Sequence, residues 1–274
     1  MNIKEVFEAH RGQLVYNLKN GGNRGDALIN QSVTELFTAH GVHFKDLWFP
    51  ENIIGEVLFV NGCGNFCSAH HHMVHLVKFY EKRFRKIYIL PSSFEASFPL
   101  VNQFLSDLRS NVVIYCRERF SFDQVLKIRN SEQVFLDSDM AFYFDWSKID
   151  VKGGAGELYA FRKDRERNFD VSIPDGNRDI SVDSKFWHNW RVFNACKFLG
   201  KKYNAKIRAI FERQRCYDFV NEIAKYDEIY TDRAHVAITG AMLNKNVYLY
   251  QNNYHKIKGI YENSMVDMHN IKLM

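Results

Sequence analysis

The sequence predicts an α/β protein with two parallel sheets, each covered by helices. Two patterns indicate this fold class. Short apolar segments alternate with segments whose apolar residues recur at helical spacing, and a glycine-rich stretch near residue 150 separates two such series. A chain of 274 residues, 46% of them hydrophobic, can bury two modest cores. We therefore expect two α/β units that face a cleft, where ligands of such folds usually bind.

The first unit, residues 1–150, is predicted from alternating strand and helix patterns. Helices are expected where apolar residues recur every three or four positions, as in Ile29, Val33 and Phe37. Pro91 is expected to stop a strand, and Ser121 is a plausible helix N-cap. The predicted strands are 14–18, 57–60, 87–90, 112–115 and 134–136, and the predicted helices are 26–40, 73–84, 99–108 and 121–128.

The second unit, residues 151–274, follows a polar stretch that ends in Gly153-Gly154-Ala155-Gly156, the best linker candidate. Residues 164–183 are charged and loop-like, and residues 205–211 fit either a strand or a helix. The predicted strands are 157–161, 228–231 and 247–250, and the predicted helices are 186–199, 217–224, 257–265 and one that begins near Arg233.

The amino-acid composition limits the classes of ligand and the cellular location that we expect for this protein. The formal net charge of +5 favours anionic small molecules or a loose attraction to an anionic membrane surface, and it is too mild to indicate nucleic acid. Five scattered cysteines argue against a disulfide framework. The sequence has neither a signal-peptide pattern nor an apolar run of roughly 20 residues. We expect a cytoplasmic protein, with at most a peripheral contact at the inner face of the membrane.

The most informative segment runs from Tyr230 to His235, between a short strand and a small-residue helix. A helix start offers unpaired backbone N–H groups and the positive end of the helix dipole, which together attract anions. Arg233 can bind phosphate or carboxylate with two prongs, and His235 can move protons near neutral pH. Structural roles are the alternative: Asp232 as a helix cap, Arg233 paired with a carboxylate, and His235 as a half-buried residue.

Polar loops also follow the other predicted strands. Turn formation alone explains any one of them, but jointly they place Arg, Lys, Asn, Asp and His at several strand ends, where packing is a weaker explanation. These loops are residues 20–26, 61–65, 91–93, 116–118, 162–164 and 253–256.

A cluster of histidines and cysteines invites a zinc hypothesis, which we reject. His71 and His75 are spaced i,i+4, but the sequence has no Cys-x-x-Cys pair, and histidines at helix starts often face solvent. We predict no metal, and we keep open that residues 70–72 line an acceptor cleft.

Taken in order, the loop motifs resemble one enzyme family, the polysaccharide pyruvyl transferases. The resemblance spans nearly the whole chain, and the segment from Thr231 to His235 is its most specific part. The motifs are Gly22-Asn23-Arg24-Gly25-Asp26, Asn61-Gly62-Cys63-Gly64-Asn65, Leu90-Pro91-Ser92-Ser93, Arg117-Glu118, Arg162-Lys163-Asp164, Thr231-Asp232-Arg233-Ala234-His235 and Tyr254-His255-Lys256.

The resemblance implies two Rossmann-like units with parallel sheets facing a cleft, a GT-B-like fold, with residues 1–150 on the acceptor side and 151–274 on the donor side. It implies phosphoenolpyruvate as the donor and a sugar diol of a bacterial surface polysaccharide, or of its lipid-linked precursor, as the acceptor. The products are a cyclic pyruvate ketal and phosphate, and no cofactor is expected.

The same resemblance assigns site residues. His235 and Arg233 are expected to be catalytic, with His235 as a general acid or base. The donor-binding residues are Arg162, Arg233, His235 and Lys256. The acceptor or cleft residues are Asn23, Gly25, Asp26, Gly64, Asn65, Ser92, Arg117 and Glu118. Two alternatives stay open: a GT-B-like glycosyltransferase that uses a nucleotide sugar, and a non-catalytic protein of this fold that binds glycan or phosphate.

Overall fold

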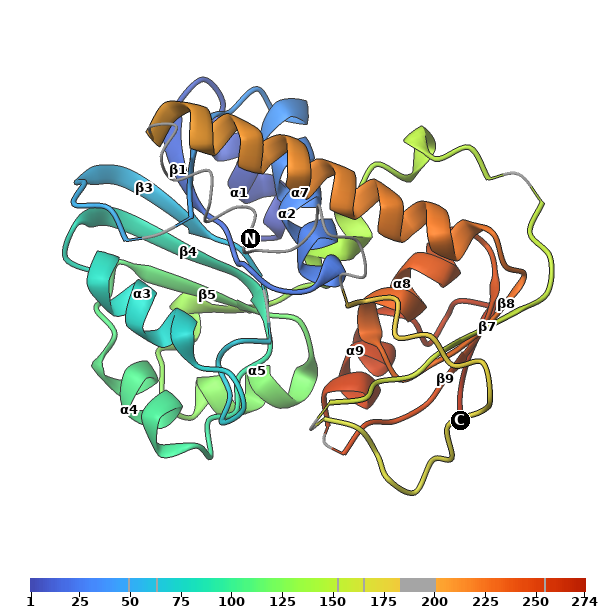
Figure 1. The fold of residues 1–274 in the computed structure, drawn as a ribbon. Coiled ribbons are helices and arrows are strands. Elements are labelled where there is room, and N and C mark those ends of the chain that lie inside the picture. The colour runs from blue at the N-terminus through green and yellow to red at the C-terminus, as the bar shows by residue number, and fades with distance from the viewer. Residues whose placement is uncertain (49, 63, 152, 165, 183–200, 254) are drawn as a thin grey trace. The chain divides into compact units, whose positions relative to one another are not determined.

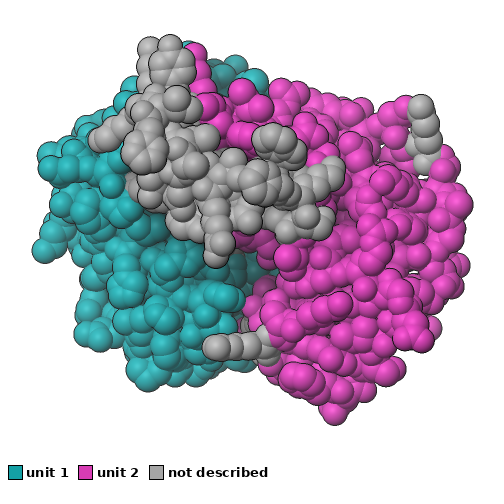
Figure 2. Space-filling model, viewed as in Figure 1, with its two compact units in different colours: residues 1–21, 32–143, 259–264 teal, residues 22–31, 144–258, 265–274 magenta. Residues whose placement is uncertain are grey.

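The chain divides into two compact units, shown in Figure 2. The computed structural model describes residues 1–48, 50–62, 64–151, 153–164, 166–182, 201–253 and 255–274. Unit 1 comprises Met1–Gly21, Ser32–Tyr143 and Gly259–Ser264, and unit 2 comprises Gly22–Gln31, Phe144–Lys258 and Met265–Met274. The first turns of one helix therefore belong to unit 2, although the sequence around them belongs to unit 1.

Unit 1 is built on a six-stranded parallel sheet with the strand order β2-β1-β3-β4-β5-β6, of which Figure 1 labels β1, β3, β4 and β5. The order reverses between β1 and β3, and in open α/β sheets such a reversal marks the carboxyl edge where ligands bind. The strands are β1 Leu14–Leu18, β2 His43–Leu47, β3 Gly55–Val60, β4 Phe84–Ser92, β5 Val112–Cys116 and β6 Val134–Leu136.

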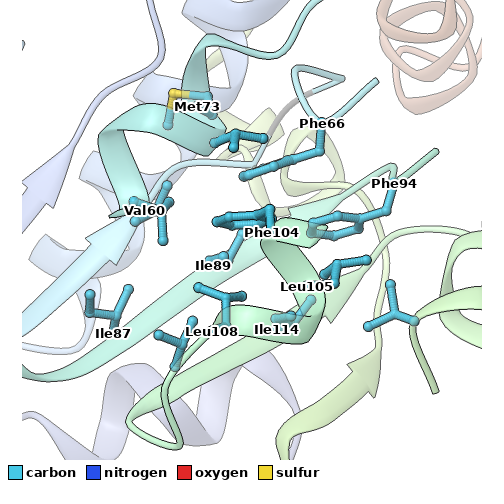
Figure 3. Packing of buried hydrophobic residues seen from close by; sticks show 14 of the residues in the cluster. Val60, Phe66, Met73, Ile87, Ile89, Phe94, Phe104, Leu105, Leu108 and Ile114 are labelled. Atoms are coloured by element: carbon cyan, nitrogen blue, oxygen red, sulfur yellow. The ribbon is translucent and has the colours of Figure 1, made fainter. Parts of the chain in front are cut away.

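Helices cover both faces of this sheet because the side chains of each strand alternate between its faces. On β3, Val60 packs into the cluster formed with α3, α4 and α5 that Figure 3 shows, whereas Phe59 lies 5.1 Å from the rings of Phe7 and Phe37 on the opposite face. The helices are α1 Ile3–Ala9, α2 Arg24–Ala39, α3 His72–Tyr80, α4 Pro99–Asp107 and α5 Arg119–Leu126, with short 3₁₀ turns at Ser131–Gln133, Met140–Tyr143 and Trp146–Lys148.

Unit 2 contains a four-stranded parallel sheet with the order β10-β9-β8-β7. Helix α8 packs tightly on it: a Cβ added at Gly240 would lie 2.5 Å from Ile229 and 2.9 Å from Val247. The strands are β7 Glu157–Ala160, β8 Glu228–Thr231, β9 Asn246–Leu249 and β10 Ile271–Leu273, and the helices are α7 Lys201–Ala224, α8 Ala234–Met242 and α9 Lys256–Ser264.

The α/β class and the parallel sheets are confirmed, and several local predictions are wrong for physical reasons. Strand β4 continues through Pro91 to Ser92, because an irregularity in its pairing with β5 accommodates a residue without an N–H group. Glu118, and not Ser121, is the N-cap of α5: its carboxylate accepts the backbone N–H of Ser121 at 2.8 Å. Helix α3 ends at Tyr80, since Phe84 already begins β4.

Two further predictions concern the second unit, and three of the described helices and strands were not indicated by the residue patterns. Residues 205–211 are helical, as part of α7, and the helix predicted at 186–199 lies outside the described residues. Helix α1 and strands β2 and β10 were not predicted. Within the part of the chain that the structure describes, no helix combines the length and the apolar character needed to cross a membrane.

Candidate functional site

The segment from Thr231 to His235 joins β8 to α8 and fixes the direction of the arginine between them. Arg233 is the N-cap residue of α8, with an extended backbone and without a side-chain capping bond. The Thr231 hydroxyl accepts the backbone N–H of Arg233 at 3.0 Å and donates to the carbonyl of Ala160, at the end of β7, at 2.8 Å. The capping role considered for Asp232 is therefore wrong: its carboxylate accepts the backbone N–H of Arg162 at 2.8 Å.

Arg162 follows β7 and has a side chain that is only 7% exposed. Its Nε and Nη2 donate to the two carboxylate oxygens of Asp164 at 2.8 and 3.0 Å, a two-pronged geometry. Its Nη1 lies 2.7 Å from a carboxylate oxygen of Glu166, which in turn lies 3.2 Å from the Nζ of Lys256. Two of the sequence-predicted donor-site residues, Arg162 and Lys256, are thus linked in unit 2 through an acidic side chain.

Arg233 is held in the same way. Its Nε donates at 3.1 Å to one oxygen of Asp179, and its Nη2 donates to the other. The Nη2 group also lies 3.2 Å from Asp164, which bridges the two arginines. The sequence alternative in which Arg233 pairs with a carboxylate is therefore confirmed, and this pairing does not exclude a role toward an anionic ligand.

His235 lies in the first turn of α8, against the first turn of α2. A Cβ added at Gly25 would clash with the imidazole Nδ1 and lie 2.7 and 2.8 Å from the Cγ and Cβ of His235, so only glycine leaves room for this ring. The turn itself is fixed by reciprocal capping: the Asn23 side chain accepts the backbone N–H of Gly25, and the Asp26 carboxylate accepts the backbone N–H of Asn23, both at 2.8 Å. Asn23, Gly25 and Asp26 thus lie beside the predicted donor residues.

The charges of this cluster act on two carboxyl groups. Burial raises the pKa of Asp232 above its ordinary value, against the pull of Arg162 and Arg233. Burial would also raise the pKa of Asp164, but the hydrogen bond from Arg162 and the charges of both arginines outweigh it and lower this pKa to about 2. Asp164 therefore stays ionised well into the acid range.

The lowered pKa of Asp164 predicts part of the acid sensitivity of the fold. A carboxyl group whose pKa falls on folding contributes stability above its unfolded pKa, near 3.8, and loses it as the pH falls through about 2. We expect Asp164→Asn to show a shallower loss of stability between pH 4 and 2 than wild type, by a modest amount, because the side chain is 46% exposed. Chemical denaturation across this pH range measures it, with exposed Asp170→Asn as the control; parallel curves would contradict the prediction.

In unit 1, polar side chains gather where the strand order reverses. Asn20 follows β1 and Asn65 follows β3, and the side-chain Nδ2 of Asn65 donates to the side-chain Oδ1 of Asn20 at 2.8 Å. The carbonyl of Gly64 accepts the thiol of Cys67 at 3.2 Å. Ser92, also named from the sequence, is buried and donates to the backbone carbonyl of Leu90. Of these predicted acceptor residues, Gly64 and Asn65 lie at the edge that the topology marks.

Arg117 and Glu118, expected at the acceptor or cleft, are both fully buried. Arg117 donates to the hydroxyl of Ser93 at 2.8 Å and to the carboxylate of Asp139 at 2.6 Å, and Glu118 caps α5. These contacts give the pair a scaffold role in unit 1, since neither side chain has a surface on which a ligand could rest.

Sequence reasoning missed Glu166, Asp179 and Asp139, which hold the arginines. The first two lie in the charged stretch 164–183, and the density of acidic residues there was the only signal. In the histidine cluster, the ring centroids of His71 and His75 lie 6.0 Å apart, and the ring of His71 also lies 5.8 Å from that of Phe98. Among the described residues, no group of three or more His, Cys, Asp or Glu side chains is placed to hold a metal ion.

Comparison with known proteins adds two findings. The family model of the polysaccharide pyruvyl transferases matches residues 23–254. The crystal structure of a functionally uncharacterized protein from Klebsiella pneumoniae subsp. pneumoniae is similar with a TM-score of 0.73 and 24% identity, covering 98% of this chain and 95% of that chain. At this identity the second likeness shows the fold alone. A search of curated proteins gave no match.

Proposed function

The chain belongs to the polysaccharide pyruvyl transferase family, and we propose that it transfers pyruvyl from phosphoenolpyruvate to a sugar diol of a bacterial surface polysaccharide or of its lipid-linked precursor. Family membership supports a transferase that acts on a saccharide. The donor, the ketal product and the residues below are our proposal, as is a GT-B-like arrangement in which unit 1 carries the acceptor. We place the reaction in the cytoplasm.

One observation carries the choice of donor. Arg162, Arg233 and Lys256 converge within unit 2, and both arginines present their forks to carboxylates. Phosphoenolpyruvate carries a carboxylate and a phosphate, which are the two groups that guanidinium forks bind best. A nucleotide sugar would bring a base and a ribose as well, and the contacts that the structure describes for these three cations are ion pairs, which suit neither group.

The proposed reaction requires a proton to be added to a carbon of the donor and protons to be removed from the two acceptor hydroxyls. Protonation of the methylene carbon of phosphoenolpyruvate makes the neighbouring carbon electrophilic, and one acceptor hydroxyl adds to it with loss of its proton. The C–O bond to phosphate then breaks, the second hydroxyl adds with loss of its proton, and the ketal and phosphate leave. Of the two hydroxyl protons, one balances the new methyl group and the other leaves with phosphate.

His235 is the proposed general acid or base for these transfers, because it shares the first turn of α8 with the N-cap Arg233. The contact of its ring with Gly25 orients the imidazole. Arg233 would hold the donor anion and stabilise the charge on the leaving phosphate.

We expect His235→Ala to lower kcat by about 10²–10⁴-fold while phosphoenolpyruvate still binds, since positioned acid–base groups contribute on this scale. The assay is phosphate release from phosphoenolpyruvate with galactose-, glucose- and N-acetylmannosamine-containing acceptors. Exposed His43→Ala on β2 is the matched control. An unchanged kcat would remove His235 from the mechanism.

The same assay separates the alternatives. Acceptor-dependent phosphate release that disappears in Arg233→Ala supports the transferase and the donor site. Thermal stabilisation by a nucleotide sugar, and not by phosphoenolpyruvate, would favour a glycosyltransferase instead. Glycan binding without phosphate release from any acceptor, unaltered in His235→Ala, would favour a non-catalytic binding protein.

A further inference from the structure

The fork of Arg233 is already occupied by a side chain of the protein itself. Both oxygens of Asp179 accept from this guanidinium, one from Nε at 3.1 Å and the other from Nη2. This is the two-pronged geometry that an external carboxylate or phosphate would use. Both side chains are less than 10% exposed, so the pair is shielded from water. An anionic ligand cannot take this fork while Asp179 holds it.

The charges around the guanidinium of Arg233 also indicate that a carboxylate must move before an anion can bind there. Within the described cluster, four carboxyl groups face three cations: Asp164, Glu166, Asp179 and the buried Asp232 oppose Arg162, Arg233 and Lys256. A cluster without an excess of positive charge attracts a multiply charged anion weakly. A strong anion site therefore requires one of these carboxylates to leave.

Of the three carboxylates that form ion pairs in this cluster, Asp179 has the fewest partners among the described residues. Asp164 bridges both arginines and accepts the backbone N–H of Glu166 at 3.1 Å, and Glu166 contacts Arg162 and Lys256. The contacts that the structure gives the carboxylate of Asp179 all go to Arg233. Its segment, residues 171–182, forms turns but neither helix nor strand. Backbone hydrogen bonds hold this segment on both sides of Asp179, from the N–H of Arg178 to the carbonyl of Tyr159 at 2.9 Å and from the N–H of Arg24 to the carbonyl of Ser181 at 3.0 Å, so a displacement of Asp179 involves its side chain alone.

A cavity of about 460 Å³ in unit 2 lies beside Asp179 and offers it another place. Three basic side chains, Arg24, Arg178 and Lys225, line the cavity together with three acidic ones, Asp179, Asp218 and Glu222. Arg178 and Lys225 share a single carboxylate partner, Glu222, at 2.7 and 2.6 Å. The cavity therefore provides both room and cations for a displaced carboxylate.

We propose that Asp179 is an internal counter-ion that occupies the fork of Arg233 in the absence of donor and moves into this cavity when an anionic donor takes its place. The residue thereby sets the affinity and the selectivity of the anion site, because only a ligand that pairs with Arg233 better than Asp179 does can displace it. The identity of the donor rests on the proposed function, but the displacement holds for any anion that binds Arg233.

Titration calorimetry of Asp179→Asn with phosphoenolpyruvate and with inorganic phosphate tests the proposal. Removing the competitor should lower both dissociation constants by about tenfold, because the fraction of molecules with an open fork rises. Asp175→Asn removes the same charge from an exposed position of the same segment and should leave them unchanged. An equal or higher dissociation constant in Asp179→Asn would mean that Asp179 positions Arg233 instead, and would overturn the proposal.

A second variant tests the cavity without touching the ion pair. Asn221 on α7 is exposed and lines the cavity, so Asn221→Phe narrows it at little risk to folding. It should weaken the binding of both anions several-fold, whereas unchanged binding would overturn the displacement into the cavity. If neither wild type nor Asp179→Asn binds phosphoenolpyruvate, the donor assignment fails, and the phosphate titration alone decides the role of Asp179.

Discussion

Gly25→Ala should reduce kcat by about 10²-fold or more, although alanine is the better helix former at this position. The added Cβ would clash with the imidazole of His235, with 2.7 Å to its Cγ and 2.8 Å to its Cβ. Real Cβ atoms do not approach other atoms so closely, so the ring must leave its position or α2 must shift. Either movement misplaces the proposed acid–base group. Steady-state kinetics of phosphate release measures the effect, and a kcat within a few-fold of wild type would contradict it.

A matched glycine and a double variant isolate the steric cause. A Cβ added at Gly153 meets nothing within 4 Å, so Gly153→Ala should keep full activity. Overpacking at Gly25 should cost about 1–3 kcal/mol of folding stability. This cost should shrink in a His235→Ala background, because two of the three short contacts then disappear. An equal cost in both backgrounds would show that the strain lies elsewhere.

The fold was predictable wherever one residue pattern dominates a segment. The buried strands β3 and β5 are continuous apolar runs, and α2 carries a regular apolar stripe, so their positions follow from periodicity. Strand β2 was missed because it is an edge strand whose exposed residues His43 and Lys45 interrupt the apolar signal. Helix α1 is short, and the capping box of Asn2 with Glu5 that starts it was overlooked.

The candidate site was predictable as far as topology determines it. The sequence places Arg162 and Arg233 at the ends of two predicted parallel strands, and therefore at the same edge of a sheet; the structure shows that these strands are neighbours. Asp179, the partner of Arg233, lies in a segment without periodicity, and its position depends on tertiary contacts alone. The ring of His235 against Gly25 joins residues 210 positions apart, a contact that no local pattern encodes.

Arg117 in unit 1 is a second residue whose tertiary contacts could not be predicted from the local sequence. Its substitution is expected to have the largest effect on stability. Its position after a buried strand suggested a ligand contact, but the guanidinium lies inside the protein, where it donates to Ser93 and Asp139. Asp139 also accepts the backbone N–H of Ala141 at 2.9 Å and is itself fully buried. The pair therefore joins the ends of β4 and β5 to the chain that follows β6. Removing one partner leaves the other as a buried charge without an ion pair.

We expect Arg117→Met to lower the free energy of unfolding by about 3–5 kcal/mol, because an unpaired buried carboxylate keeps the desolvation cost and loses the ion pair. Urea denaturation followed by tryptophan fluorescence measures the loss. Adding Asp139→Asn should recover a large part of it, since the amide removes the stranded charge while its oxygen can still accept the N–H of Ala141. The ligand-contact hypothesis predicts the opposite pattern, with near-normal stability and weakened acceptor binding. Because Arg117 has no exposed surface, we expect a stability loss with acceptor affinity unchanged in the folded fraction.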